Sequence, residues 1–193
     1  MIRTGDHIEN ARTGQRMTFQ VTAEDSDGAL LRIDSYNPPC PFEPVHIHPL
    51  QESSAEVLSG SLVFMVRDRE IRLGPGDRGV IPPNAPHTFR NEGPGEAHSI
   101  MEFRPALRIA EFFETLFVLA QRGELTAAGM PSLLQIALSG PAFGSEIRLP
   151  SPPWPIQRLA LAPLAPIALL RGLRQTSSWD PSAPVRADLK AAR

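Results

Sequence analysis

Three histidines in two short segments constrain the fold of this chain more than any other feature of its sequence. His46 and His48 lie two residues apart, and His87 follows later in the chain, after a Gly-Pro-Gly turn. On a β-strand, residues two apart project from the same face, so His46 and His48 can point into one interior. Neutral imidazole is a good ligand for Zn, Cu, Fe and Ni. A fold that joins all three rings at one metal must bring separate β-segments together.

Short segments of alternating or apolar residues, separated by turn residues, surround these histidines. Met17, Phe19 and Val21 alternate with polar residues, as in a strand with one buried face. Many short strands at regular spacing predict a β-sandwich or barrel. The predicted strands are 17–21, 31–36, the segment that carries His46 and His48, 55–58, 62–66, 69–73, 78–82, 87–91 and 96–103.

The later histidine belongs to a segment with characteristic spacing, formed by Gly76, Pro82, Asn84, His87 and Asn91. Together with His46, His48 and Gly60, this spacing resembles the two motifs of the cupin superfamily, G(x)5HxH(x)3–4E(x)6G and G(x)5PxG(x)2H(x)3N. Asn84 stands where the family has glycine, which is a mild change because asparagine tolerates a left-handed backbone. The resemblance covers roughly residues 15–105. It implies a cupin-type double-stranded β-helix or jelly-roll barrel, and with the helices expected after residue 105 the predicted fold class is mainly β with C-terminal α-helices. It also implies one divalent transition metal, Fe, Mn, Ni, Cu or Zn, held by the three histidines.

The first motif leaves the fourth metal ligand open. Counting back from Gly60 places the family's glutamate at Ser53, whereas Glu52 lies one residue earlier. In one interpretation, Glu52 reaches the metal after a small shift of its loop. In a second, the site has three histidines and no carboxylate. In a third, the metal site is degenerate and the barrel binds a ligand without metal.

The expected lining of the barrel favours a small, mainly apolar or aromatic ligand. Both faces of the strand 62–66 are apolar, and no lysine or arginine can be assigned to the interior. A strongly anionic substrate is therefore disfavoured. The candidate substrate contacts are Gln51, Tyr36, Phe64 and His98. His98 also fits the alternative of a histidine on a surface strand.

An open three-histidine site leaves coordination positions for water, substrate or dioxygen, as catalytic metal sites do. A redox-active metal supports oxygenase chemistry, and a redox-inert metal supports Lewis-acid chemistry. The sequence therefore predicts a metal-dependent enzyme that is dioxygenase-like or isomerase- or cyclase-like. The alternative is a non-catalytic cupin that binds a small ligand.

The hydrophobic period changes after the barrel, which divides the chain into four parts. We expect an irregular lead-in at 1–14, the barrel at 15–105, a helical extension at 106–173 and a disordered tail at 174–193. A stripe of apolar residues from Ala106 onward predicts one helix, and Pro131 opens a second. These helices are expected to pack outside the barrel or across a dimer partner.

Within the segment 156–171, the twelve residues 159–170 are almost wholly apolar but include Pro163 and Pro166. This stretch is too short to cross a bilayer, which needs about 20 residues. Arg158 and Arg171 at its ends would permit a shallow, peripheral membrane contact. Burial against the protein or a second subunit is the favoured interpretation.

The composition of the chain limits the classes of partner and the cellular compartment that we expect. The chain has 193 residues and a net charge of −2, with no dense cluster of lysine and arginine, so nucleic acid is not an expected partner. Its single cysteine, Cys40, cannot form an internal disulfide, which fits a reducing compartment. The N-terminus lacks the apolar core of a signal peptide. We therefore expect a cytoplasmic protein, and a homodimer.

Overall fold

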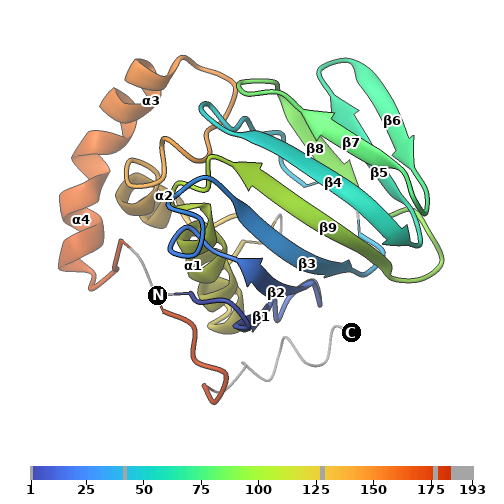
Figure 1. Ribbon diagram of the computed structural model, residues 1–193. Helices are drawn as coiled ribbons and strands as arrows, with labels where there is room; N and C mark the ends of the chain where they lie inside the picture. The colour runs from blue at the N-terminus through green and yellow to red at the C-terminus, as the bar shows by residue number, and fades with distance from the viewer. Residues whose placement is uncertain (1, 41–42, 127–128, 176–177, 184–193) are drawn as a thin grey trace.

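The computed structural model consists of two antiparallel β-sheets that face each other, with a group of helices at one end (Figure 1). It describes residues 2–40, 43–126, 129–175 and 178–183. The larger sheet has the strand order β1-β2-β3-β9-β4-β7, and the smaller has the order β6-β5-β8. The strands are β1 (His7–Glu9), β2 (Arg16–Val21), β3 (Leu31–Asn37), β4 (Glu52–Ser59), β5 (Leu62–Val66), β6 (Arg69–Leu73), β7 (Arg78–Ile81), β8 (His87–Arg90) and β9 (Ala97–Arg104). The architecture confirms the predicted mainly β, cupin-type fold with C-terminal helices.

The inner face of the large sheet is covered by two different partners. Toward β1, β2 and β3, it packs against helix α1 (Ile109–Gln121), with Phe19 and Phe117 among the buried side chains. Toward β4 and β7, it packs against the small sheet, with Val57 and Phe64 in the shared core. Helix α1 therefore lies on the inner face of this sheet, whereas the sequence led us to expect it outside the barrel. The large sheet extends beyond the small one, and α1 covers the apolar surface that remains.

Two parts of the predicted organisation differ from the structure. The lead-in is not wholly irregular, because β1 pairs with β2 and buries Ile8 completely. The segment with His46 and His48 is not a regular strand but makes isolated bridges, His46 with His87 and Ile47 with Arg148. Prolines on both sides of this segment limit its pairing, because proline cannot donate to a ladder.

The C-terminal extension is partly folded back onto the sheets. Ile47 and Arg148 exchange two backbone hydrogen bonds, of 2.9 and 3.0 Å. Part of the expected disordered tail is also docked, since Trp179 packs against the α1 core and its backbone N–H donates to Glu114. Residues 176–177 and 184–193 of that tail lie outside the described residues.

The remaining helices form an outer layer. Helix α2 (Leu133–Ser139) packs against α4 (Ala165–Leu170), which continues from α3 (Trp154–Leu161) through the short 3₁₀ turn η1 (Ala162–Leu164). Figure 1 shows α3 and α4 at the edge of the molecule, on the side away from the small sheet. Within the described ranges, no helix is long and apolar enough to cross a membrane.

Candidate metal centre

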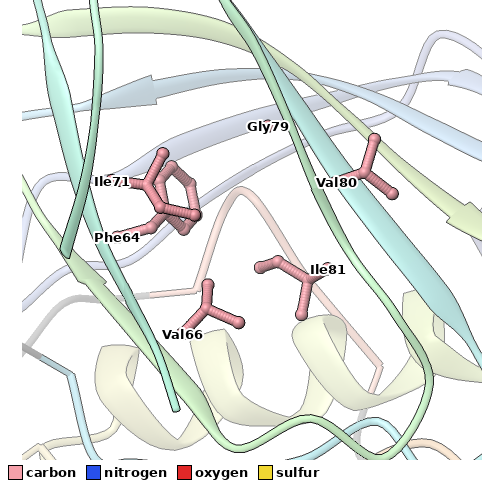
Figure 2. A pocket seen from close by; sticks show the side chains of 6 residues that line it. All are labelled: Phe64, Val66, Ile71, Gly79, Val80 and Ile81. Atoms are coloured by element: carbon pink, nitrogen blue, oxygen red, sulfur yellow. The ribbon is translucent and has the colours of Figure 1, made fainter. Parts of the chain in front are cut away.

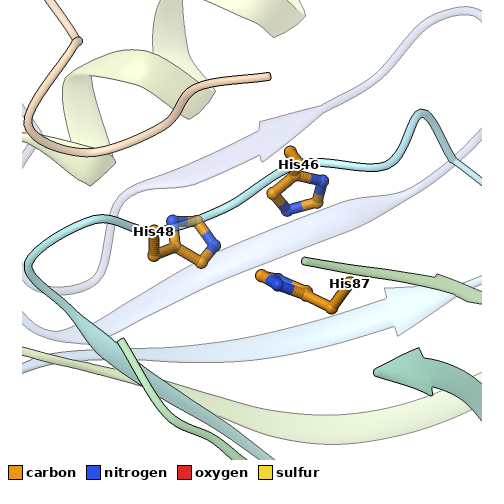
Figure 3. Close-up of side chains that lie close together, drawn as sticks. All are labelled: His46, His48 and His87. Carbon is orange, nitrogen blue, oxygen red and sulfur yellow. The ribbon is translucent and has the colours of Figure 1, made fainter. Parts of the chain in front are cut away.

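His46, His48 and His87 lie together between the two sheets, as the spacing of the motifs predicts (Figure 3). One ring nitrogen from each lies within 4.8 Å of the others. His87 opens β8, and its backbone exchanges two hydrogen bonds with His46, of 3.0 and 2.9 Å. The carbonyl oxygen of His48 accepts a hydrogen bond of 2.8 Å from the N–H of Asn84, in the turn before β8. Backbone pairing between the two motif segments therefore brings the three rings together.

A backbone carbonyl orients each of the three rings. A carbonyl oxygen can only accept a hydrogen bond, so the facing Nδ1 carries the proton and the lone pair of Nε2 is left free. Metal-binding histidines commonly have this kind of partner, which sets both the tautomer and the direction of the ring. The acceptors are the carbonyl oxygens of Pro44, 2.9 Å from His46, Glu146, 2.6 Å from His48, and Ala85, 2.9 Å from His87.

Burial keeps the rings neutral at physiological pH. It lowers the pKa of His46 to about 3, with a further contribution from the two neighbouring rings. It lowers the pKa of His48 to about 4 and also lowers the pKa of His87. Imidazole must be deprotonated to bind a metal, so the site holds its ligands in the binding form.

These residues fit a divalent transition metal. Three neutral nitrogen donors suit zinc, copper, iron or nickel better than magnesium or calcium, which prefer oxygen. Three protein ligands also leave coordination positions for other molecules, as in catalytic sites.

The structure does not bring Glu52 to the three rings. Glu52 is exposed at the start of β4, opposite Arg104. Ser53, the next residue, points to the inner face because side chains alternate along a strand. Its Oγ is buried and has no hydrogen-bond partner among the described residues. Among all the residues that the structure describes, the group of possible metal ligands consists of the three histidines and contains no carboxylate.

Two of the four candidate substrate contacts lie inside the protein. Phe64 lines an apolar hollow between β5, β6 and β7, seen in Figure 2. Gln51 is fully buried, and its Nε2 donates to the carbonyl oxygens of Pro105 and Ala106, at 2.9 and 3.0 Å. Its Oε1 has no partner among the described residues.

The other two candidates lie on the outer face of the large sheet. Tyr36 alternates with the buried residues Ser35 and Asn37, so its ring points away from the interior. It stacks on His98, with the ring centroids 4.2 Å apart, and His98 pairs with Asp34. The structure therefore separates Tyr36 and His98 from the metal centre, in agreement with the surface-strand alternative for His98.

Two acidic residues with buried or perturbed side chains were not singled out from the sequence. Glu146 supplies the carbonyl that orients His48, and its own side chain is 3 % exposed, with Oε2 unpartnered within the described chain. Glu43 precedes the first histidine, is half-buried, and has its pKa raised to about 7 by burial. No local pattern marks Glu146, because it lies 98 residues from His48.

Comparisons with known proteins found a family model and several solved structures that are similar to part of this chain. Residues 35–101 match the family model described as a cupin domain. A search of curated proteins found no match. Among solved structures, the chain is similar to KdgF from Halomonas sp., at 20% identity and a TM-score of 0.42, over 48% of this chain and 79% of that one. It is similar to a predicted oxalate decarboxylase from Thermotoga maritima, at 18% identity and a TM-score of 0.46, over 54% of this chain and 98% of that one. It is also similar to the DMSP lyase DddQ from Ruegeria pomeroyi DSS-3, at 28% identity and a TM-score of 0.37, over 42% of this chain and 40% of that one.

Proposed function

We propose that this chain, a member of the cupin superfamily through its domain at residues 35–101, is a metal-dependent enzyme that acts on a small, mainly apolar or aromatic molecule. One observation carries the proposal. Three neutral imidazoles converge within 4.8 Å, and each is held by a backbone carbonyl with Nε2 free. A cluster of buried histidines without a ligand would leave these nitrogens desolvated and unpaired, which is costly.

A metal bound at these nitrogens would supply either Lewis-acid polarisation or a centre for dioxygen chemistry, which corresponds to an isomerase- or cyclase-like or a dioxygenase-like reaction. The protein's own part is to fix the rings and to shape the space beside them. The backbone bonds of His46, His48 and His87 hold the donors on rigid segments, so little reorganisation is needed on binding.

The apolar character of the proposed substrate is supported by the small apolar hollow between β5, β6 and β7. Val66, which lines it, pairs directly with His87, and Ile81 pairs with Ser53. Of the buried polar side-chain atoms without a partner among the described residues, Ser53 Oγ and Gln51 Oε1 lie where the chain leads from the histidines into β4. We propose that these two oxygens orient the ligand while apolar side chains bind it, as in most small-molecule sites.

A non-catalytic ligand-binding cupin is the second candidate. It is favoured by the absence of a carboxylate from the histidine group within the described chain. Such a protein would bind its ligand without turnover. Our sequence-based expectations of a cytoplasmic location and a homodimer stay predictions.

Metal analysis of the purified protein tests the proposal. We expect close to one transition-metal ion per chain, and its loss in His87→Ala. His98→Ala is the matched control, because it removes a histidine from the outer face and should keep the metal. Circular dichroism would show that both variants fold. Negligible metal after anaerobic reconstitution would rule out the enzyme and favour the second candidate.

A further inference from the structure

The outer surface of α3, η1 and α4 is apolar and uncovered. Leu159 is 77 % exposed and Leu170 is 88 % exposed, although both belong to regular helices. Ile156, Ile167 and Leu169 are also strongly exposed. The structure thus leaves one side of the segment 156–171 uncovered by the rest of the described chain, although burial against the protein was the first of the fates expected from the sequence. We call this surface the apolar helix face.

Helical spacing explains why the exposed residues form one face. Ile156, Leu159, Pro163, Ile167 and Leu170 follow one another at intervals of three or four residues, which places them on the same side of a helix. The opposite side faces the protein and contains buried Ala168 with half-buried Leu161 and Leu164. A surface helix normally has one apolar side, turned inward. This one has two, and the outward side needs a partner.

The charges around the apolar helix face are all positive. Arg158 and Arg171 flank it, and Arg174 follows, all three exposed. The chain has no aspartate or glutamate between residues 147 and 179, although its net charge is −2. Within the described residues, none of the three arginines takes part in an ion pair. The face therefore presents apolar surface with a purely cationic rim.

We propose that the apolar helix face binds the surface of an anionic lipid bilayer, with α3 and α4 lying in the plane of the interface. Exposed leucine and isoleucine would enter the boundary between headgroups and acyl chains, and the arginines would contact lipid phosphates. The inference does not depend on the metal centre. It concerns attachment at the surface, since no described helix can cross a membrane.

The charges disfavour a second copy of the chain as the occupant. A two-fold interface places the same patch on both subunits. Two antiparallel copies of this helix would bring Arg158 of one close to Arg171 of the other, with no acidic residue in the segment to compensate. An anionic lipid surface would instead neutralise the charge of both arginines.

Vesicle co-sedimentation of the full-length protein tests the proposal. We expect binding to vesicles of phosphatidylcholine with phosphatidylglycerol, and much weaker binding to phosphatidylcholine alone. An arginine near an anionic membrane is worth about fivefold in partitioning, so Arg158→Gln with Arg171→Gln should weaken binding by roughly 25-fold. Leu170→Asp should abolish it. High salt should weaken it as well.

Matched controls isolate the helix face. Arg67→Gln with Arg69→Gln removes two exposed arginines elsewhere, and Leu58→Asp changes an exposed leucine of β4. Both variants should bind vesicles like the wild type. The proposal is overturned if the wild type stays in the supernatant with both kinds of vesicle, or if Leu170→Asp binds as well as the wild type. A dimer that Leu170→Asp dissociates, without vesicle binding, would assign the face to a second copy instead.

Discussion

Lowering the pH from 7 to 5 should destabilise the metal-free protein through His46 and His48. Burial lowers their pKa values to about 3 and about 4, whereas an unfolded histidine has a pKa near 6.5. Between these values, the unfolded chain binds protons that the folded protein does not. The stability is therefore complete above pH 6.5 and is lost as the pH falls toward the folded pKa values.

The size of this effect follows from the shifts. Each pH unit below 6.5 costs about 1.36 kcal/mol for each histidine, as long as the folded protein stays unprotonated. At pH 5 the loss is roughly 2 kcal/mol for each ring, or about 4 kcal/mol for the pair. His87, whose pKa is also lowered, adds to the loss in the same direction. This is a large part of the 5–15 kcal/mol that is typical of total protein stability.

Glu43 changes the pH dependence of stability in the opposite direction, so its contribution must be measured separately from that of the histidines. Burial raises its pKa to about 7, so the folded protein binds a proton that the unfolded chain releases above its ordinary pKa of 4.5. Acidification from pH 7 to 5 then restores stability. The gain is at most about 2 kcal/mol, because the side chain is half-buried and solvent screens it.

Urea unfolding in the presence of a chelator, at pH 7 and pH 5, measures both contributions. We compare the wild type with His46→Gln/His48→Gln, with Glu43→Gln, and with His7→Gln, which changes an exposed histidine. The double variant should lose about 4 kcal/mol less than the wild type on acidification, and Glu43→Gln should lose more than the wild type. His7→Gln should behave like the wild type. Equal losses in the wild type and the double variant would refute the argument that the histidines are buried in the neutral form.

Four further substitutions test local features of the fold by urea or thermal unfolding. Gly60 has a φ of +74°, and an added Cβ would lie 2.8 Å from the backbone of β9, so Gly60→Ala should cost more than the 1–2 kcal/mol of left-handed strain. Gly76→Ala, at a φ of +87° with no atom in the way, should cost only that strain; equal losses would contradict the predicted clash. Ser132→Ala removes the side chain that caps α2 and should cost about 1 kcal/mol, whereas no change in midpoint would show that the cap is not stabilising. Asn84→Gly, at a φ of +62°, should be neutral or slightly stabilising, and a clear loss would mean that the Asn84 side chain has a role beyond its backbone conformation.

The strands and the three histidines could be predicted because their signals are local. The alternation of Met17, Phe19 and Val21 places β2 within one residue of its observed start, Arg16. The spacing from Gly76 to His87 sets the turns that return the second motif to the first. The positive φ of Asn84 agrees with the left-handed conformation that its place in the motif requires. Each of these features depends on neighbours within a few residues.

The direction of single side chains needed the register of whole strands. Glu52 and Ser53 differ by one position, and because strand side chains alternate, one faces solvent and the other the interior. The same alternation puts Tyr36 and His98 on the outer face. Matching a motif still succeeds when a ligand is misplaced by one residue. In a strand, the same shift moves the side chain to the opposite face of the sheet.

The amino-acid sequence by itself predicted most of the strands, through side-chain periodicity and turn chemistry, and its resemblance to the cupin motifs indicated the three histidines as candidate metal ligands. Only the tertiary structure decided that the carbonyl of Glu146 orients His48, that α1 covers the inner face of the large sheet, and that the segment 156–171 has an exposed face. These features depend on which surfaces meet across long separations in the chain. Local propensity does not carry that information, because an apolar helix has the same sequence pattern whether its partner is the protein core, another subunit or a membrane.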